Sequence, residues 1–301
     1  MNSDIDVLRE AAARHFDGVP DGQRQVHTPI PYLSFLRFLR PTEMSRGILE
    51  PSICLVLQGR KKVLIGAAIK HYGPGSYVLS VVDMPVSGQV TRATQDEPYL
   101  GLKIDLDPKE IAALVIDLRL AVPNKPASAA GACVDAAGAE LQDAFVRLLK
   151  LLAAPADRAA LAPLVKQEIL YRLLSGPSGA MLYHTLLGER REQGVSAAIQ
   201  WIKQHYDQPM KIEELAREVS MSPSVLHRRF KAVTVMSPLQ YQKRMRLTEA
   251  RKLLLAGSME AATAAYRVGY ESPSQFSREY RRLFGASPLQ DAEFLRHHDI
   301  E

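Results

Sequence analysis

Apolar positions follow two different periods along the chain, and the change of period predicts different kinds of element. Between Val7 and Phe16 the spacing is helical, which predicts a short amphipathic helix at the start. After Pro20 the apolar runs become short and are broken by Gly and Pro, as in YLSFLRFL, SICLVLQG, KKVLIG, SYVLSVV, SGQVT and YLGLKIDL. Runs of this length predict β-strands, with turns at IGAA and YGPGSY. Many short strands at close spacing indicate a small barrel or sandwich.

Helical spacing returns at Pro108, where PKEIAALVIDLRL predicts the start of a helix. Two further helices are predicted by apolar stripes, one formed by Leu141, Phe145, Leu148 and Leu152, the other by Leu161, Val165, Ile169 and Leu173. Such a stripe suits a helix packed on a core and also a subunit interface, so both interpretations stay open. As an interface, the first stripe would let residues 1–190 self-associate.

The last third of the chain is predicted to be helical, and it contains an internal repeat. SPS at residues 222–224 recurs at 272–274, and SPLQ at 237–240 recurs at 287–290. A long helix, LQYQKRMRLTEARKLLLA, lies between the copies and is expected to end at Gly257; Gly285 is expected to stop the last helix of the second copy. The polar segment GERREQG, residues 188–194, precedes this third. It predicts a junction between one domain over residues 1–190 and another over 194–295.

Each copy of the repeat predicts a helix, a tight turn and a second helix, at about residues 212–233 and 260–284. Serine before proline opens a helix well, because serine caps free N–H groups and proline needs none in the first turn. Within the second helix of each copy, Leu226 and Phe230, or Phe276 and Tyr280, lie four residues apart and are expected to face the core. The fold class is therefore α+β, a small barrel or sandwich with helices followed by an all-α domain.

The opposite face of each second helix carries side chains that suit DNA. The candidates for contacts to base edges are Ser224, His227, Arg228, Ser274, Gln275 and Arg278. Further along the helices, the candidates for phosphate contacts are Lys231, Arg281 and Arg282. Helix-turn-helix geometry also occurs in all-α proteins that bind no nucleic acid, but two copies with Arg at the same position favour double-stranded DNA.

The charge distribution agrees with a nucleic-acid face in the last third. The formal net charge is +5, and residues 194–290 hold 15 Lys and Arg against 8 Asp and Glu. The rest of the chain holds 23 against 25, so the basic excess is local. A solvated charged surface would give the same count, so the charge supports the repeat and does not replace it.

Residues from about Val195 to Phe294 resemble the DNA-binding domain of the AraC/XylS family of bacterial transcription regulators. VGYESPSQFSREYRRLFGASP, residues 268–288, is similar to the family signature around its second helix-turn-helix unit. The resemblance implies seven helices, with two helix-turn-helix units in consecutive major grooves and the six residues named above on the bases. Ala264 and Tyr266 depart from the family, which usually has aliphatic residues there, and we expect altered packing.

Residues from about Pro29 to Asp107 resemble the cupin-type sensor domain found in one branch of that family, through PSICLVLQGRKKVLIG and HYGPGSYVLS. This resemblance implies a barrel that binds a small-molecule effector, followed by helices that dimerise. Enzymatic cupins need histidine and carboxylate metal ligands. The eight histidines, at positions 15, 27, 71, 184, 205, 227, 297 and 298, place no pair on a strand at ligand spacing. We therefore expect neither a metal, nor another cofactor, nor catalysis.

The two cysteines, Cys54 and Cys133, form no disulfide framework and suit a reducing cytoplasm. Cys54 lies in an apolar run, which predicts a buried side chain; the alternative is a sensor thiol activated by residues Arg60 to Lys62 across a hairpin. The N-terminus lacks a signal pattern, and no apolar run is long enough to span a bilayer.

The sequence thus predicts a cytoplasmic, effector-controlled transcription regulator that acts as a homodimer on a DNA operator, where RNA polymerase is a further candidate partner. The alternatives are a cupin enzyme, with or without metal, fused to a DNA-binding domain, and a DNA-binding protein without an effector. The sequence identifies neither the effector nor the operator.

Overall fold

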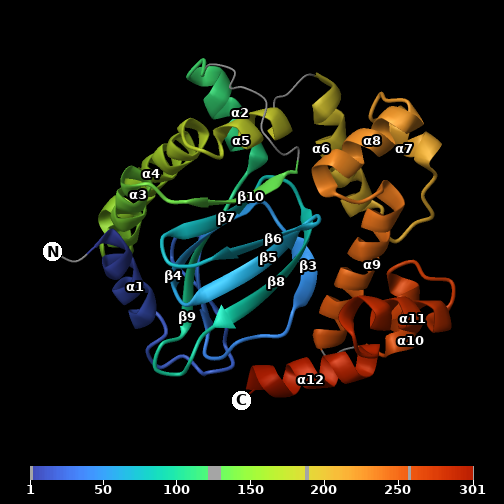
Figure 1. Cartoon of the computed structure of the whole chain (residues 1–301), viewed down its shortest axis with the longest axis horizontal. Helices are drawn as coiled ribbons and strands as arrows, with labels where there is room; N and C mark the ends of the chain where they lie inside the picture. The colour runs from blue at the N-terminus through green and yellow to red at the C-terminus, as the bar shows by residue number, and fades with distance from the viewer. Residues whose placement is uncertain (1–2, 121–129, 187–189, 257–258, 301) are drawn as a thin grey trace.

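A central barrel with helices around it forms the molecule, as the computed structural model shows in Figure 1. The structure describes residues 3–120, 130–186, 190–256 and 259–300, without the side chains of residues 190–193 and 295–300. Helices α1 to α5 cover one side of the barrel, and α6 to α12 follow the other side (Figure 1). The α+β fold class predicted from the sequence is confirmed.

Two antiparallel sheets make the barrel. The order of the six-stranded sheet is β1-β2-β9-β4-β7-β10, and that of the four-stranded sheet is β3-β8-β5-β6. The strands are β1 Gln25–His27, β2 Leu33–Phe38, β3 Ser45–Leu49, β4 Ser52–Gln58, β5 Arg60–Ile65, β6 Ala68–Tyr72, β7 Ser76–Ser80, β8 Met84–Arg92, β9 Tyr99–Asp105 and β10 Ala132–Ala136. All six apolar runs named above fall in strands. β1, β3, β6 and β10 have weak apolar patterns and were missed.

The six-stranded sheet is buried on both faces, which explains its continuous apolar runs. Along β4, Ile53 and Leu55 point to a core shared with the helices α1 to α5, and Cys54 and Val56 point to the barrel interior. All four side chains are buried. Alternate side chains of β4 therefore pack into two different cores. Because a shift by one residue would exchange the two sets, this burial on both faces fixes the register of β4.

The first five helices are α1 Asp4–Arg14, α2 Pro108–Asp117, α3 Ala139–Lys150, α4 Pro155–Ser175 and α5 Gly179–Leu186. The stripe on α3 packs into the core: Leu141, Phe145 and Leu148 are buried, and Leu152, in the turn after α3, is partly buried. Of its two interpretations the core is confirmed, and this stripe offers no free surface to a second subunit. Of the second stripe, on α4, Ile169 and Leu173 are buried.

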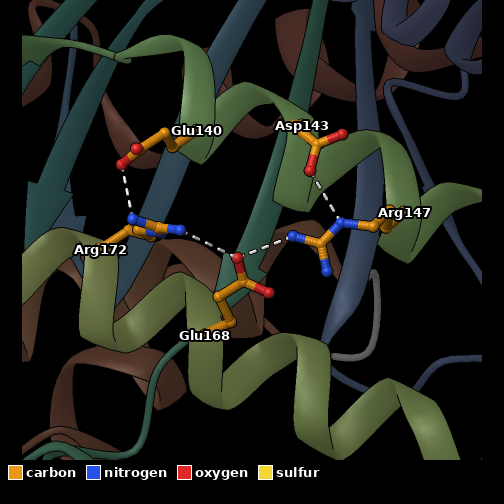
Figure 2. A network of polar contacts seen from close by, with 5 residues as sticks. All are labelled: Glu140, Asp143, Arg147, Glu168 and Arg172. Atoms are coloured by element: carbon orange, nitrogen blue, oxygen red, sulfur yellow. Dashed lines mark hydrogen bonds and ion pairs between the residues drawn. The ribbon is translucent and has the colours of Figure 1, made fainter.

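An ion-pair network holds α3 against α4 on their polar sides (Figure 2). Arg147 Nη2 lies 2.7 Å from Glu168 Oε1, and Arg147 Nε lies 2.8 Å from Asp143 Oδ2. Arg172 contacts Glu140 and the same Glu168 oxygen. On the outer side of α4, away from this core, Leu161, Leu164 and Tyr171 are exposed.

The last seven helices in the described residues are α6 Arg190–Gln204, α7 Ile212–Glu218, α8 Pro223–Thr234, α9 Pro238–Leu255, α10 Ala261–Arg267, α11 Pro273–Phe284 and α12 Pro288–Ile300. Seven is the number that the family resemblance implies. Most of the expected junction, from Arg190 on, is the start of α6, while residues 187–189 lie outside the described residues. Gly257, the expected stop of the long helix, also lies outside them.

Candidate nucleic-acid interface

Two helix-turn-helix units lie at the two ends of α9 (Figure 1). The first is formed by α7 and α8 and the second by α10 and α11, close to the bounds predicted from the sequence. We call α8 and α11 the recognition helices. Ser222 and Ser272 cap them by accepting hydrogen bonds from the backbone N–H of Val225 and Gln275, and proline follows each cap. The serine-proline pairs thus do what the sequence predicts.

The two turns need a residue with positive φ, and the two copies supply it differently. Gly269 has a φ of +86°, and a Cβ there would collide with the Asp207 carbonyl. In the first copy the equivalent residue is Ser220, with a φ of +55°. The second turn therefore requires glycine for both conformation and space, whereas the first tolerates a side chain.

Apolar pairs fix each recognition helix on its core, as predicted. Leu226, Phe230, Phe276 and Tyr280 are all fully buried. The Tyr280 hydroxyl donates to Asp291 at 2.7 Å. Ala264 is buried in the core of the second unit. Tyr266 is 59% exposed, so its ring lies outside that core, at a position where the family usually has an aliphatic residue.

All nine side chains predicted to contact DNA are exposed: Ser224, His227, Arg228, Lys231, Ser274, Gln275, Arg278, Arg281 and Arg282. Within the described residues no ion pair or hydrogen bond engages the guanidinium groups of Arg228 and Arg278. The Ser224 hydroxyl lies 3.4 Å from that of Ser222. The structure thus leaves a polar and basic face on each recognition helix accessible to a ligand.

Gln275 is tied to a carboxylate that the sequence analysis missed. Its side-chain amide donates to Glu279 Oε1 at 3.3 Å, and Lys243 of α9 donates to the same oxygen at 2.8 Å. The Tyr270 hydroxyl donates to Glu279 Oε2 at 2.8 Å. Glu279 therefore connects the second recognition helix to the turn before it and to α9. Its side chain is 16% exposed. The spacing of Gln275 and Glu279 was visible in the sequence, but the contact with Lys243 was not.

α9 joins the two units through carbonyl groups. Arg246 donates to the backbone oxygens of Tyr206, Gln208 and Gly269, and Gln242 donates to those of Tyr206 and Gln208. Burial lowers the pKa of Arg246, and nearby acidic groups partly offset this. Because one guanidinium binds both the loop before α7 and the turn of the second unit, it sets their relative position. A cleft of about 360 Å³ beside it is lined by Lys243 and Gln275.

The barrel contacts the C-terminal ends of both recognition helices. Gly131 N–H donates to the Val233 carbonyl of α8 at 3.0 Å. Arg46 of β3 donates to the Leu283 carbonyl of α11 at 2.9 Å. The N-terminal halves, which carry the candidate base contacts, point away from these attachments. The barrel can therefore influence how the recognition helices are held without covering their exposed faces.

The barrel interior is filled by side chains. The buried residues between the two sheets include Val56, Val63, Tyr72, Val78, Met84, Val90 and Tyr99. Cys54 is among them at 6% exposure, and burial raises the pKa of its thiol despite Lys61 and Lys103 nearby. The buried interpretation of Cys54 is confirmed, and an activated sensor thiol is not what the structure shows. Burial also raises the pKa of Cys133 to about 12.

Metal ligation finds no support in the described part of the chain. There, no group of three or more His, Cys, Asp or Glu side chains lies close enough together to hold a metal ion. His71 is exposed on β6, and the side chains of His297 and His298 lie outside the described residues. None of the helices in the described ranges is both long and apolar enough to cross a bilayer.

Named relatives match part of the chain. The HTH-type transcriptional activator RhaS of Pectobacterium carotovorum subsp. carotovorum is 31% identical over 115 residues, which is 38% of this chain and 40% of RhaS. The virulence regulon transcriptional activator VirF of Yersinia enterocolitica is 32% identical over 126 residues, 41% of this chain and 45% of VirF. The chain thus spans less than half the length of each of these relatives.

Solved structures resemble the whole fold. ToxT from Vibrio cholerae, in a form bound to an unsaturated fatty acid, superposes with a TM-score of 0.60 at 13% identity, covering 88% of this chain and 93% of ToxT. Apo ToxT K231A gives the same TM-score at 10% identity, covering 89% of this chain and all of that one. At such identity the likeness establishes the fold.

Two family models match the chain. Residues 215–293 match a helix-turn-helix domain, and residues 29–181 match the N-terminus of AraC-type transcriptional regulators. These families and relatives are regulators, which agrees with the prediction that the chain is not an enzyme. Because the second match covers more than half of the sequence, the chain belongs to the AraC-type transcriptional regulators.

Proposed function

We propose that the chain is a sequence-specific DNA-binding transcriptional regulator that responds to a small-molecule effector. The observation that carries this proposal is the pair of recognition helices with matching exposed faces. Each has an arginine, four residues after an exposed serine, whose guanidinium pairs with none of the described residues. Arginine reads guanine through two parallel hydrogen bonds in the major groove. α9 and Arg246 would hold the two faces at a fixed separation, as consecutive grooves demand.

The exposed residues divide by their position along the recognition helix. Ser224, His227 and Arg228 in α8 would contact bases, as would Ser274, Gln275 and Arg278 in α11, because the front of a recognition helix enters the groove. Lys231, Arg281 and Arg282 lie further along, where the helix leaves the groove floor, and would contact phosphates. The tie between Gln275 and Glu279 would restrict the orientation of that amide at its base pair.

The partners beyond DNA follow from the family and from the surface. ToxT with a bound fatty acid supports a small organic effector for this fold. Relatives that are activators make RNA polymerase an expected partner at the promoter, in the cytoplasm.

A second copy of the chain would pack on the outward side of α4, where Leu161, Leu164 and Tyr171 are 43%, 59% and 38% exposed. This surface replaces the buried α3 stripe as the dimer candidate.

Selection of binding sites from randomised DNA tests the proposal. The wild-type chain should select one sequence, and Arg228→Ala and Arg278→Ala should each lose about 1–3 kcal/mol and relax the preference at one position. Those two positions should lie roughly 10–11 base pairs apart, because both helices need the same side of the duplex. Arg281→Ala should weaken all sequences equally and lower the salt slope by about one.

Arg40→Ala is the matched control, since Arg40 is an exposed arginine that follows β2 of the barrel and belongs to neither recognition helix. It should leave the selected sequence and the affinity unchanged. If the wild type selects nothing at low salt, the chain is not a sequence-specific DNA-binding protein. If Arg228→Ala and Arg278→Ala relax the same base pair, the two units do not read separate grooves.

A further inference from the structure

A cavity of about 260 Å³ lies at the seam between the barrel and the DNA-binding helices. The barrel contributes Glu50, which follows β3, and Asp83, which precedes β8. The opposite wall comes from Lys203 of α6 and from Thr248 and other residues of α9. This cavity is outside the filled barrel interior, and both domains form its walls.

Asp83 is a buried carboxylate with an unsatisfied oxygen. Its side chain is 1% exposed; its Oδ1 accepts from Lys203 Nζ at 2.9 Å, and its backbone carbonyl accepts from the Tyr241 hydroxyl at 2.8 Å. Its Oδ2 has no hydrogen-bond partner among the described residues. A buried polar atom without a partner costs free energy, so this oxygen favours a donor brought from outside.

Carboxylates outnumber ammonium groups around the cavity. Lys252 is paired with Glu249 at 2.9 Å, and Lys203 is already used by Asp83. No described residue forms an ion pair with Glu50, which is exposed at the rim. The Thr248 hydroxyl is buried and accepts or donates no hydrogen bond within the described part of the chain. The lining thus has three carboxylates against two lysines, so it disfavours an anion.

We infer that this seam cavity binds a small polar molecule through hydroxyl or ammonium donors, with Asp83 Oδ2 as the central acceptor. The volume is slightly below the usual range for ligand pockets, roughly 300–1,000 Å³, which suits a molecule the size of a monosaccharide or a short diamine. A ligand here contacts Asp83, which is bonded to α6 and α9. Because α9 packs against both recognition helices, a ligand at Asp83 would change how they are held. Its role as the effector site rests on the proposed function.

Charge-selective thiol labelling tests the chemistry of the cavity without knowledge of the natural ligand. Thr248→Cys in the full chain is treated with three methanethiosulfonates of similar size, bearing an ethylammonium, a hydroxyethyl or an ethylsulfonate group. Ala160→Cys, exposed on α4, is the control. The ratio of ammonium to sulfonate labelling rates should be about tenfold higher at residue 248 than at residue 160. Glu50→Gln in the Thr248→Cys chain should lower this ratio, and Asp83→Asn should lower it further.

The hydroxyethyl reagent separates the two ligand classes. Labelling as fast as with ethylammonium assigns the cavity to neutral polyols, and labelling closer to the sulfonate rate assigns it to amines. A ratio at residue 248 equal to that at residue 160, or no labelling by any reagent where residue 160 reacts, would overturn the inference.

Operator affinity then tests the regulatory role. The ammonium-labelled Thr248→Cys chain should bind its selected DNA with a Kd changed by about fivefold or more, and the labelled Ala160→Cys chain should not. Charge-selective labelling with an unchanged Kd would overturn the effector role alone. Loss of DNA binding by the unlabelled wild type would count against the proposed function and not against the cavity.

Discussion

The space beside one residue makes one turn of the repeat less tolerant of substitution than the other. Gly269 and Ser220 occupy equivalent positions, both with positive φ. At Gly269 there is also no room, because the Asp207 carbonyl stands where a Cβ would be. At Ser220 the side chain is accommodated, and the remaining cost is conformational.

We expect Gly269→Ala to lower the free energy of unfolding by about 3 kcal/mol or more, since it adds a collision to an unfavourable φ. Ser220→Gly should be neutral or raise it by up to about 1 kcal/mol, because glycine adopts this φ without strain. Chemical denaturation followed by circular dichroism measures both. Equal and small effects at the two positions would contradict this account of the turns.

At the scale of the element, Glu279 fastens the second recognition helix to α9. Burial opposes ionisation of its carboxyl, but hydrogen bonds from Lys243, Tyr270 and Gln275 outweigh burial and lower its pKa below the ordinary 4.5. A carboxyl whose pKa is lower in the folded state binds fewer protons there than in the unfolded chain. Its stabilisation is therefore complete above about pH 4.5 and is lost as pH falls through the folded-state pKa.

Glu279→Gln should lower the free energy of unfolding at neutral pH, and its difference from wild type should shrink as the pH falls below about 4.5. Denaturation at a series of pH values measures this difference. Glu213→Gln, at an exposed position of α7, is the control and should change the free energy of unfolding little. A Glu279→Gln difference that grows in acid would mean that the network does not stabilise the ionised carboxylate.

Elements with strong local signals could be predicted from the sequence, and tertiary contacts could not. The serine-proline caps and the pairs Leu226/Phe230 and Phe276/Tyr280 gave the bounds and buried faces of the recognition helices. Strands such as β3 and β6 are exposed along much of their length and so lack an apolar pattern. The sequence could not decide whether the α3 stripe packs into a core or forms a subunit interface. Helical periodicity indicates that one face of a helix is covered, but it does not identify what covers that face. Arg246 and Asp83 act through partners far away in the sequence.

At the scale of the whole molecule, the exposed apolar side of α4 is the candidate surface for a second copy of the chain. Leu164→Asp should lower the mass measured by sedimentation, since a charge on an outward apolar stripe disfavours association and disturbs no core. Leu289→Asp, at a leucine of similar exposure on α12, should leave the mass unchanged. A wild-type chain that stays monomeric at high micromolar concentration would contradict the dimer, and equal effects of both variants would place the interface elsewhere.

The two helix-turn-helix units differ in how far they depend on the barrel. Buried residues of α6, α7, α8 and the first half of α9 belong to one cluster with the barrel interior. Val235, just after α8, packs beside Gly66 of the barrel. The second unit has a core of its own, which includes Leu254, Val268, Phe276 and Tyr280. Its hydrogen bonds to the barrel, in the described residues, come from Arg46.

A fragment of residues 190–301 should therefore lose more order in its first unit than in its second. Hydrogen exchange should be faster in α8 of the fragment than in α8 of the full chain, and similar in α11 of both, because only α8 loses apolar cover. In site selection the fragment should keep the preference assigned to Arg278 better than that assigned to Arg228. Arg46→Ala in the full chain removes the attachment of α11 alone and should leave α8 protected. If α8 and α11 lose protection equally in the fragment, the barrel supports both units, and the division of cores does not set their stability.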